Sequence, residues 1–312
     1  MLTIPPFCPN KDCLYHNEDE IEPSKRKTWY QKDGSYFTKV NNKVQRFVCT
    51  CCGKRFSAQT FSIDYGVKRT VPYSRIFSHL ISGSGIRSLA RTLRVSEKVI
   101  INRIGRLSRN AVALHARLRG SFALQEGIVA DGFESFTGSQ YYPNNINLAV
   151  GKESQYLYCI DYAHIRRKGR MREDQMKRRE ELEKKWKAPG GDIIRSFTRL
   201  VRNIDRYRGK RCNDPVEFSR DVNNSMDRLW IYCVYHNCMK PYRVGVPREK
   251  RSHGECAGIS RSEIDKLWKT FFTRRALVSK LDLSESEWYS WYRCYATPGK
   301  YEVPWYPRYA AM

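Results

Sequence analysis

The sequence lacks any apolar run long enough to cross a bilayer. No stretch of about 18 consecutive apolar residues occurs, so we expect no membrane-spanning helix and no membrane partner. Internal repeats and low-complexity linkers are also missing. The first residues, Met-Leu-Thr-Ile-Pro-Pro, include no basic segment followed by an apolar one. We therefore expect no secretory signal.

Acidic residues are scarce. The chain carries 32 Asp and Glu against 57 Lys and Arg, which gives a formal net charge of +25 and a pI of about 9.7. A charge of this size favours a polyanionic partner, because a basic surface gains affinity by releasing the counterions of phosphate groups. DNA-binding, RNA-binding and ribosomal proteins share this property, so the charge indicates a class of partner and no more.

The cysteine count is odd. Eleven cysteines cannot all pair, which argues against a complete disulfide framework. Thiols in a chain without a secretory signal fit a reducing cytoplasm, where they bind metal or pack as small hydrophobic groups. With 312 residues, the chain is long enough for two or three domains and at least one sizeable core.

Two short cysteine pairs stand near the start of the chain, Cys8 with Cys13 and Cys49 with Cys52. Cysteine pairs that a hairpin brings together suit a tetrahedral structural Zn²⁺. Between them, aromatic and β-branched residues alternate with polar ones, and Asp33-Gly34 is a turn signal. The sequence therefore predicts a zinc ribbon. Free or disulfide-bonded cysteines are the alternative, and Cys51 and His16 are spare donors that could replace one of the four.

Residues 85–104 have the apolar spacing of two helices. The first runs from Ile86 to Leu93, and Ser96 stands where a second helix needs its N-cap. Two short helices with a tight turn predict a helix-turn-helix, whose second helix places its N-terminal residues at base edges in the major groove of double-stranded DNA. The side chains expected to point outward there are Lys98, Asn102 and Arg103. An ordinary helix pair within a bundle is the alternative.

Residues 127–164 have the pattern of three antiparallel strands in sequence. The first strand is expected to carry Asp131 at its C-terminal end. Carboxylates at such positions can hold Mg²⁺, and two such ions polarise a phosphodiester and activate the attacking water or 3′ hydroxyl. Asp131 is therefore a candidate catalytic ligand. Because a glycine follows it, a turn residue is an equally good interpretation.

Residues 166–212 are predicted to form a charged, mostly helical insertion. It begins with a basic block that contains Arg166, Arg167 and Lys168, and no acid occurs before residue 173. We interpret this block as a contact to the DNA backbone. A solvated helix face is the alternative, which the interleaved acids farther along the insertion support.

The order of these motifs resembles that of bacterial insertion-sequence transposases. The segments that carry the resemblance are Cys49-Thr-Cys-Cys-Gly-Lys-Arg-Phe-Ser57, Ile86-Arg-Ser-Leu-Ala90, Asp131-Gly-Phe-Glu-Ser-Phe136, Asp161–Met171, Phe218–Met226 and Tyr232–Tyr242. Together they cover most of the chain from residue 8 to about 260. Each motif is loose by itself, and their order is the specific part.

The resemblance implies an RNase H-like domain of the DDE type. Such a domain is a nuclease and strand transferase that acts on DNA ends with Mg²⁺ or Mn²⁺. It also implies a bacterial protein of the cytoplasm, associated with the nucleoid; a homodimer on DNA is a further expectation. A catalytically inactive transposase-derived DNA-binding protein or regulator is the alternative function.

The resemblance further implies three catalytic carboxylates, of which Asp131 fills the first place. No strand ending in aspartate is found for the second, so an internal deletion or a diverged core is the simplest account, and whether the chain is an enzyme stays open. Asp205 and Asp161 are the nearest stand-ins. Asp214 aligns best with the third place and Glu217 is its alternative. The same two residues also fit a helix N-cap with a capping box.

These predictions combine into an α+β chain of four parts. They are a zinc ribbon at 1–65, a helix-turn-helix segment at 66–120, an RNase H-like α/β domain at 121–260 with the insertion and a long helix near its C-terminal end, and an aromatic-rich tail at 261–312.

Overall fold

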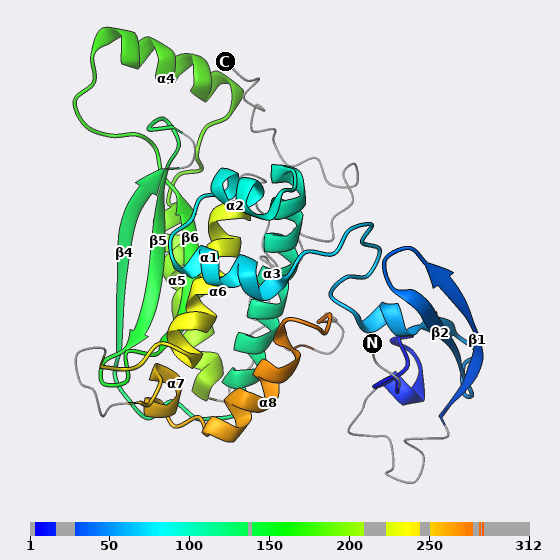
Figure 1. The fold of residues 1–312 in the computed structure, drawn as a ribbon. Coiled ribbons are helices and arrows are strands. Elements are labelled where there is room, and N and C mark those ends of the chain that lie inside the picture. The colour runs from blue at the N-terminus through cyan, green and yellow to red at the C-terminus, as the bar shows by residue number, and fades with distance from the viewer. Residues whose placement is uncertain are drawn as a thin grey trace.

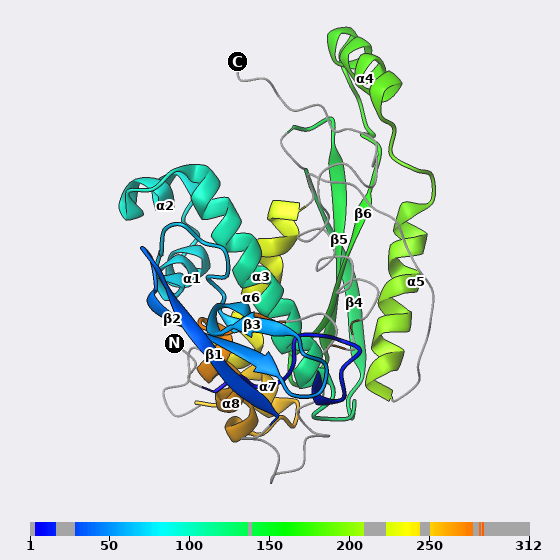
Figure 2. The same cartoon turned by 90° about the vertical axis from the view of Figure 1, so that its right-hand side faces the viewer.

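The computed structural model describes residues 4–16, 29–136, 139–208, 223–243 and 250–276, together with 281 and 283. These residues form an α+β fold with two separate three-stranded antiparallel sheets (Figure 1). The first sheet belongs to a small unit formed by residues 4–16 and 29–61, here called the cysteine module. The second sheet is covered by the helices of the larger part (Figure 2). No helix in the described ranges combines the length and apolarity that a membrane crossing requires.

The cysteine module contains a meander in the order β1-β2-β3. Its strands are β1 (Tyr30–Thr38), β2 (Asn42–Cys49) and β3 (Arg55–Ser57), with short 3₁₀ turns at Leu14–His16 and Ala58–Phe61. Four aromatic side chains form the centre of its core and are almost fully buried: Trp29, Phe47, Phe56 and Phe61. The cysteine module therefore has one small hydrophobic core, in which these aromatic side chains pack with Cys8, Cys13 and Cys49.

The turn predicted at Asp33-Gly34 is wrong. Both residues lie inside β1, where the pairing with β2 shifts register between Lys32 and Ser35. Gly34 has a φ of +68°, a left-handed conformation that suits the extra residue of a β-bulge. The chain reverses instead between Thr38 and Asn42. A glycine signal alone does not distinguish a turn from a bulge.

Six helices surround the core of the larger part. They are α1 (Tyr73–Ile81), α2 (Ile86–Leu93), α3 (Glu97–Arg119), α6 (Asn223–Cys238), α7 (His253–Cys256) and α8 (Arg261–Phe271). The long helix α3 passes through the middle and buries Ile100, Ile104, Leu107 and Ala111 completely or nearly so. Helix α8 contributes Ile264 and Phe271 to the same hydrophobic core. This helix, which the sequence assigned to a tail, therefore belongs to the core of the larger part.

The second sheet is a meander of β4 (Ile128–Phe136), β5 (Pro143–Gly151) and β6 (Leu157–His164), as residues 127–164 predict. Helix α5 (Asp192–Asp205) and the short 3₁₀ turn Arg206–Arg208 follow it. Helices α3 and α6 lie on one side of the sheet and α5 on the other (Figure 2). Helix α4 (Glu173–Lys185) stands apart from the sheet at the end of the molecule (Figure 1). All eight residues of β6 are consequently buried.

A short bridge ties the exit of the cysteine module to the other end of the described chain. Ser62 pairs with Arg274, the Ile63 amide donates to the Thr273 carbonyl at 3.0 Å, and the Arg275 amide donates to the Phe61 carbonyl at 2.9 Å. The Asn110 amide group of α3 donates to the carbonyls of Phe271 and Arg274 at 2.6 and 2.8 Å. Segments far apart in sequence thus fix where the module joins the helices.

Candidate metal centre and nucleic-acid interface

The four predicted cysteine ligands come together at one end of the cysteine module. The sulfur atoms of Cys8, Cys13, Cys49 and Cys52 all lie within 4.8 Å of one another. The Cys8–Cys52 and Cys13–Cys49 sulfur pairs are 3.6 and 3.7 Å apart. A disulfide requires about 2.05 Å, whereas sulfurs around a tetrahedral zinc with Zn–S bonds of about 2.3 Å stand about 3.8 Å apart. This group can therefore hold a metal ion, and its geometry is compatible with structural zinc.

The two spare donors are directed elsewhere. His16 is buried and its Nδ1 lies 2.7 Å from the backbone oxygen of Cys8. Cys51 is exposed and is not part of the sulfur cluster. Gly53, at a φ of +67°, turns the chain after Cys52 so that its amide donates to the Cys49 carbonyl at 3.1 Å. The local backbone thus selects the four cysteines that the spacing predicts.

The thiols of the cluster differ in acidity. Burial raises the pKa of Cys13 to about 12 and raises that of Cys8 further. For Cys52, burial acts in the same direction, but hydrogen bonds from the backbone of Lys54 and from neighbouring side chains outweigh it and lower the pKa to about 7. Three of the four cysteines are buried and Cys52 is exposed. Thiolates gathered in this way need a compensating positive charge, which a divalent cation supplies.

Helices α2 and α3 meet at a three-residue turn, where the sequence places it. Arg94 adopts a left-handed conformation with φ 52° and ψ 47°, and the Val95 amide returns to the Ala90 carbonyl at 3.0 Å. Lys98 and Asn102 are exposed on the first turns of α3. The Asn102 side-chain oxygen accepts hydrogen bonds from Arg103 and Arg106 of α3, so the amino group is the part of this amide that can donate to a ligand.

The prediction that Arg103 points outward is wrong. Its side chain is 5% exposed and donates to the carbonyl of Arg69 at 2.8 Å. Arg106, one turn later, donates to the carbonyl of Ile63 at 2.6 Å. Both guanidinium groups are drawn inward because the segment that links the cysteine module to α1 passes over this face of α3 and offers backbone acceptors. Arg103 therefore anchors the linker.

The surface beside the start of α3 is rich in positive charge, although Glu97, the first residue of α3, lies 3.5 Å from Arg87 of α2. No Asp or Glu occurs between Tyr65 and Ser96. The same stretch contains six cationic residues, Lys68, Arg69, Arg75, Arg87, Arg91 and Arg94. A cavity of about 320 Å³ between α1 and α2 is lined by Ser74, Arg75, Ser78, His79, Thr92 and Leu93. Hydroxyl, guanidinium and imidazole groups of this kind donate to phosphate oxygens.

Asp131 is the fourth residue of the nine-residue strand β4, so its predicted place at the end of the strand is wrong. The strand continues to Phe136 because Phe133, Glu134 and Ser135 pair in register with β5. The Asp131 carboxylate is exposed and accepts a hydrogen bond from the Gly132 amide at 2.7 Å. Among the described residues, the cysteine cluster is the one group of three or more His, Cys, Asp or Glu arranged to hold a metal ion.

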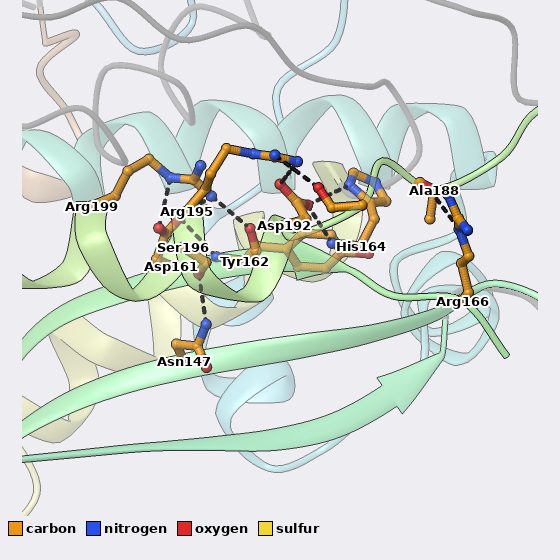
Figure 3. Close-up of polar contacts among 11 residues, drawn as sticks. Asn147, Asp161, Tyr162, His164, Arg166, Ala188, Asp192, Arg195, Ser196 and Arg199 are labelled. Carbon is orange, nitrogen blue, oxygen red and sulfur yellow. Dashed lines mark hydrogen bonds and ion pairs between the residues drawn. The ribbon is translucent and has the colours of Figure 1, made fainter. Parts of the chain in front are cut away.

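Of the remaining predicted carboxylates, those that the structure describes do not complete a magnesium site. Asp214 and Glu217 lie outside the described residues. Asp205 is the last residue of α5. Asp161, considered as a stand-in, is buried and paired with Arg199: its Oδ2 is 2.8 Å from Nε of that arginine (Figure 3). Both ligand-forming oxygens of Asp161 are occupied, since Oδ1 accepts from the Tyr162 amide at 2.8 Å.

Sequence reasoning missed the polar network around Asp161. Arg199 also donates to the Tyr162 carbonyl at 3.1 Å. Beside it, Asn147 of β5 donates to Ser196 of α5 at 2.6 Å (Figure 3). Burial raises the pKa of the Asp161 carboxyl to about 6, although the charge and hydrogen bonds of Arg199 act against the rise. The polar residues Ser196 and Arg199 on the inner face of the amphipathic α5 could have indicated this network in the sequence.

The network continues to the first turn of α5. Asp192 accepts a hydrogen bond from the His164 amide at 2.7 Å, and its Oδ2 lies 3.6 Å from Nδ1 of His164. Burial acts to raise the pKa of Asp192, but the hydrogen bonds and the charge of His164 outweigh it, and the pKa is lowered. The inward polar side chains of α5 therefore fix this helix on β5 and β6 and have a structural role.

The three basic residues that open the insertion lie between β6 and α4. Arg166 donates to the carbonyl of Ala188 at 3.0 Å, and Arg167 lies over the ring of Tyr141 at 4.8 Å. Lys168 is exposed. Arg166 and Arg167 are therefore fixed by contacts with neighbouring segments of the chain.

The chain matches no protein-family model, and no curated protein or solved structure is significantly similar to it. The resemblance to insertion-sequence transposases consequently stays a prediction from the motifs. What the fold adds is the arrangement of the cysteines, of α2 and α3, and of Asp131.

Proposed function

We propose that this chain is a double-stranded DNA-binding protein of the insertion-sequence transposase type, with an N-terminal module stabilised by zinc. The observation that carries the proposal is the helix pair α2 and α3: the exposed Lys98 and Asn102 stand on the first turns of α3, after a stretch of cationic residues without an acid. The adjacent carboxylate of Glu97 is paired with Arg87 at 3.5 Å. The net charge of +25 supports the same class of partner.

The proposed interface contains base contacts and phosphate contacts. The first turns of α3 enter the major groove, where Lys98 donates to acceptors such as guanine O6 and N7 and Asn102 donates through its free amino group. Arg75 and its neighbouring hydroxyl groups on α1 contact phosphates, which position the protein without reading sequence. Arg103 takes no part, because it is committed to the linker.

Replacement of Lys98 with alanine is expected to weaken binding to the preferred DNA roughly 5- to 150-fold, because a good base contact discriminates by about 1–3 kcal/mol. The probe is a duplex that the wild-type protein selects from a randomised pool, and fluorescence anisotropy at fixed salt measures the affinity. Lys266→Ala removes an equally exposed charge from α8 and serves as the control. Equal losses in the two variants would show that only unspecific charge attraction operates at Lys98.

Metal-dependent DNA cleavage is the second candidate function, favoured by the exposed Asp131 in the middle of a paired strand. We expect no nicking of a supercoiled plasmid that carries the DNA flanking this gene, with Mg²⁺ or Mn²⁺, because no second carboxylate of the described residues joins Asp131 to hold such an ion. Specific DNA binding measured in the same buffer shows that the protein is intact. Nicking by the wild type that Asp131→Ala abolishes would make cleavage the function instead.

A further inference from the structure

Strand β4 is an unpaired edge of the second sheet. Among the described residues it pairs with β5 on one side and with no strand on the other. It is the outermost strand of this sheet in Figure 1. The Lys152 amide donates to the Gly127 carbonyl at 2.9 Å, and the register with β5 then runs without a shift from Ile128 to Phe136. The amides and carbonyls of the even-numbered residues of β4 therefore point away from β5 and can bind another strand.

On the opposite edge of the sheet, side chains bind the backbone of β6. Asn237 of α6 both accepts from the Leu157 amide and donates to the Leu157 carbonyl, at 2.9 and 3.0 Å. Asp161 and Arg199 bind the amide and the carbonyl of Tyr162, at 2.8 and 3.1 Å. Folded proteins cover strand edges in this way because unpaired edges bind other chains. Within the described ranges, a single carboxylate binds the edge of β4.

Apolar side chains stand along the same edge. Val129, Phe133 and Phe136 are 55%, 46% and 64% exposed. Helix α5 packs mainly on β5 and β6 (Figure 2). A nine-residue edge strand with exposed apolar side chains is typical of a site where a strand of another chain is added.

We propose that the β4 edge binds a second copy of this chain, β4 against β4, about a two-fold axis that passes between the two Phe133 residues. Two strands related by an axis perpendicular to the sheet run antiparallel, and every side chain keeps its own face of the sheet. A residue can therefore face only residues an even number of positions away. The position of the axis then determines every facing pair.

The charges of β4 select the position of the axis. An axis at Asp131 or at Glu134 places that acid opposite its own copy, and like charges in this position destabilise a ladder. An axis at Gly132 places Asp131 opposite the partner's Phe133. Axes closer to either end of β4 pair fewer residues. The axis at Phe133 avoids all of these faults.

On the face of the sheet toward α3 and α6, the facing side chains complement each other. The two Phe133 rings face each other as a pair without hydrogen bonds, in which the Cα atoms stand about 4.5 Å apart, and aromatic pairs stabilise such positions. Ile146, the neighbour of Phe133 on β5, belongs to the hydrophobic core of the larger part. The two rings thus extend this core across the axis. Asp131 faces the partner's Ser135, whose hydroxyl group can donate to the carboxylate.

On the α5 face, large side chains meet small ones. Glu134 faces the partner's Gly132, and Phe136 faces the partner's Ala130. The even-numbered residues from 130 to 136 make four hydrogen-bonded pairs, which amounts to about eight hydrogen bonds between the two strands. In the single chain, the Gly132 amide donates to the Asp131 carboxylate at 2.7 Å. On pairing, this amide donates to the partner's Glu134 carbonyl instead.

The net charge of +25 on each copy opposes association. Strand β4 itself contains two acids and no cation, so the basic residues that repel each other lie away from the paired edge. Salt screens charges that stand more than about 8 Å apart at physiological ionic strength. The dimer is therefore expected to strengthen as salt is added, whereas binding to DNA weakens.

Analytical ultracentrifugation of the full chain without DNA tests the proposal. The wild type is expected to form a dimer, and Phe133→Lys is expected to raise its dissociation constant about tenfold or more, because it removes the aromatic pair and places two cations opposite each other. Ile194→Lys adds the same charge on α5, where Ile194 is 73% exposed, and should leave the dimer unchanged.

Three results would overturn the proposal. The first is a wild type that stays monomeric at all concentrations and salts; protection of its β4 amides against hydrogen exchange would then show that another part of the same chain covers the edge. The second is a dimer that Phe133→Lys leaves intact. The third is equal weakening by the two lysine variants, which indicates general charge repulsion.

A cross-link tests the register itself. The Phe133→Cys variant is expected to form a disulfide with its own copy under mild oxidation, because Cα atoms about 4.5 Å apart lie within the range that a disulfide bridges. Mass spectrometry identifies the linked peptide. Ser135→Cys should not link to itself, since four positions separate it from its own copy along the strand, about 13 Å. Equal linking of the two variants would contradict an axis at Phe133.

Discussion

Replacing Cys49 with serine is expected to release the metal of the purified protein and to unfold the cysteine module. Cys49 is 2% exposed and its sulfur lies 3.7 Å from that of Cys13. Structural zinc sites contribute apparent binding free energies of about 10–16 kcal/mol at neutral pH. A unit of this size, with one small aromatic cluster, cannot replace that contribution. Elemental analysis measures the zinc content, and limited proteolysis between residues 29 and 61 reports the folded state of the module.

The neighbouring Cys51 provides a matched control. It is exposed and lies outside the sulfur cluster, although it is two residues from Cys49. Cys51→Ser is therefore expected to retain the zinc and the protease resistance of the wild type. Equal zinc in Cys49→Ser and the wild type would refute the metal site, and equal loss in both serine variants would show that the four ligands have been assigned incorrectly.

The Asp161→Asn variant is expected to lower the free energy of unfolding by about 3–5 kcal/mol, because it leaves the guanidinium group of Arg199 buried without a compensating charge. Arg199 is 4% exposed and reaches both Asp161 and the Tyr162 carbonyl. The new amide group also points donors at a side chain that can only donate. Urea denaturation followed by circular dichroism in the far ultraviolet measures the change.

Asp174→Asn tests whether burial, and not the loss of an ion pair as such, sets the size of this effect. Asp174 lies 3.2 Å from Arg172, and the two side chains are 67% and 76% exposed. Solvent screens an exposed pair, so the expected loss is below about 1 kcal/mol. If the two asparagine variants are destabilised equally, the buried network around Asp161 does not hold α5 in place.

Features marked by patterns of nearby residues could be predicted from the sequence. The short spacing within each cysteine pair predicted which four sulfurs meet, although Cys8 meets Cys52 and Cys13 meets Cys49 across the chain. Helix α3 begins after Ser96, where the sequence predicts it, although the Ser96 side chain makes no capping hydrogen bond. The three strands of the second sheet follow from alternation over residues 127–164. In each case residue types and spacings close together in the chain carried the prediction.

Features that depend on partners distant in the sequence could not be predicted. Arg103 lies at the edge of the buried stripe of α3, three residues after Ile100 and four before Leu107, and the acceptor that keeps its charge inside is the distant carbonyl of Arg69. Asp161 acquires its partner Arg199 only when α5 folds back on the sheet. The short apolar run before Asp131 predicts a strand that ends there, whereas pairing with β5 carries the strand on to Phe136.

The bridge between Ser62 and Arg274 has a consequence for protein synthesis. All four cysteines have been made once residue 52 leaves the ribosome, so the proposed metal site can form early. Its junction with the helices closes only after residue 276 has been added, when Ala276 donates to Asn110 at 3.2 Å. During that interval the module and the growing helical part are free to fold independently, since domains form in the order in which they are synthesised. Docking of the cysteine module onto the helices thus joins residues more than 200 positions apart and comes last. We expect this step to be the slow phase of folding.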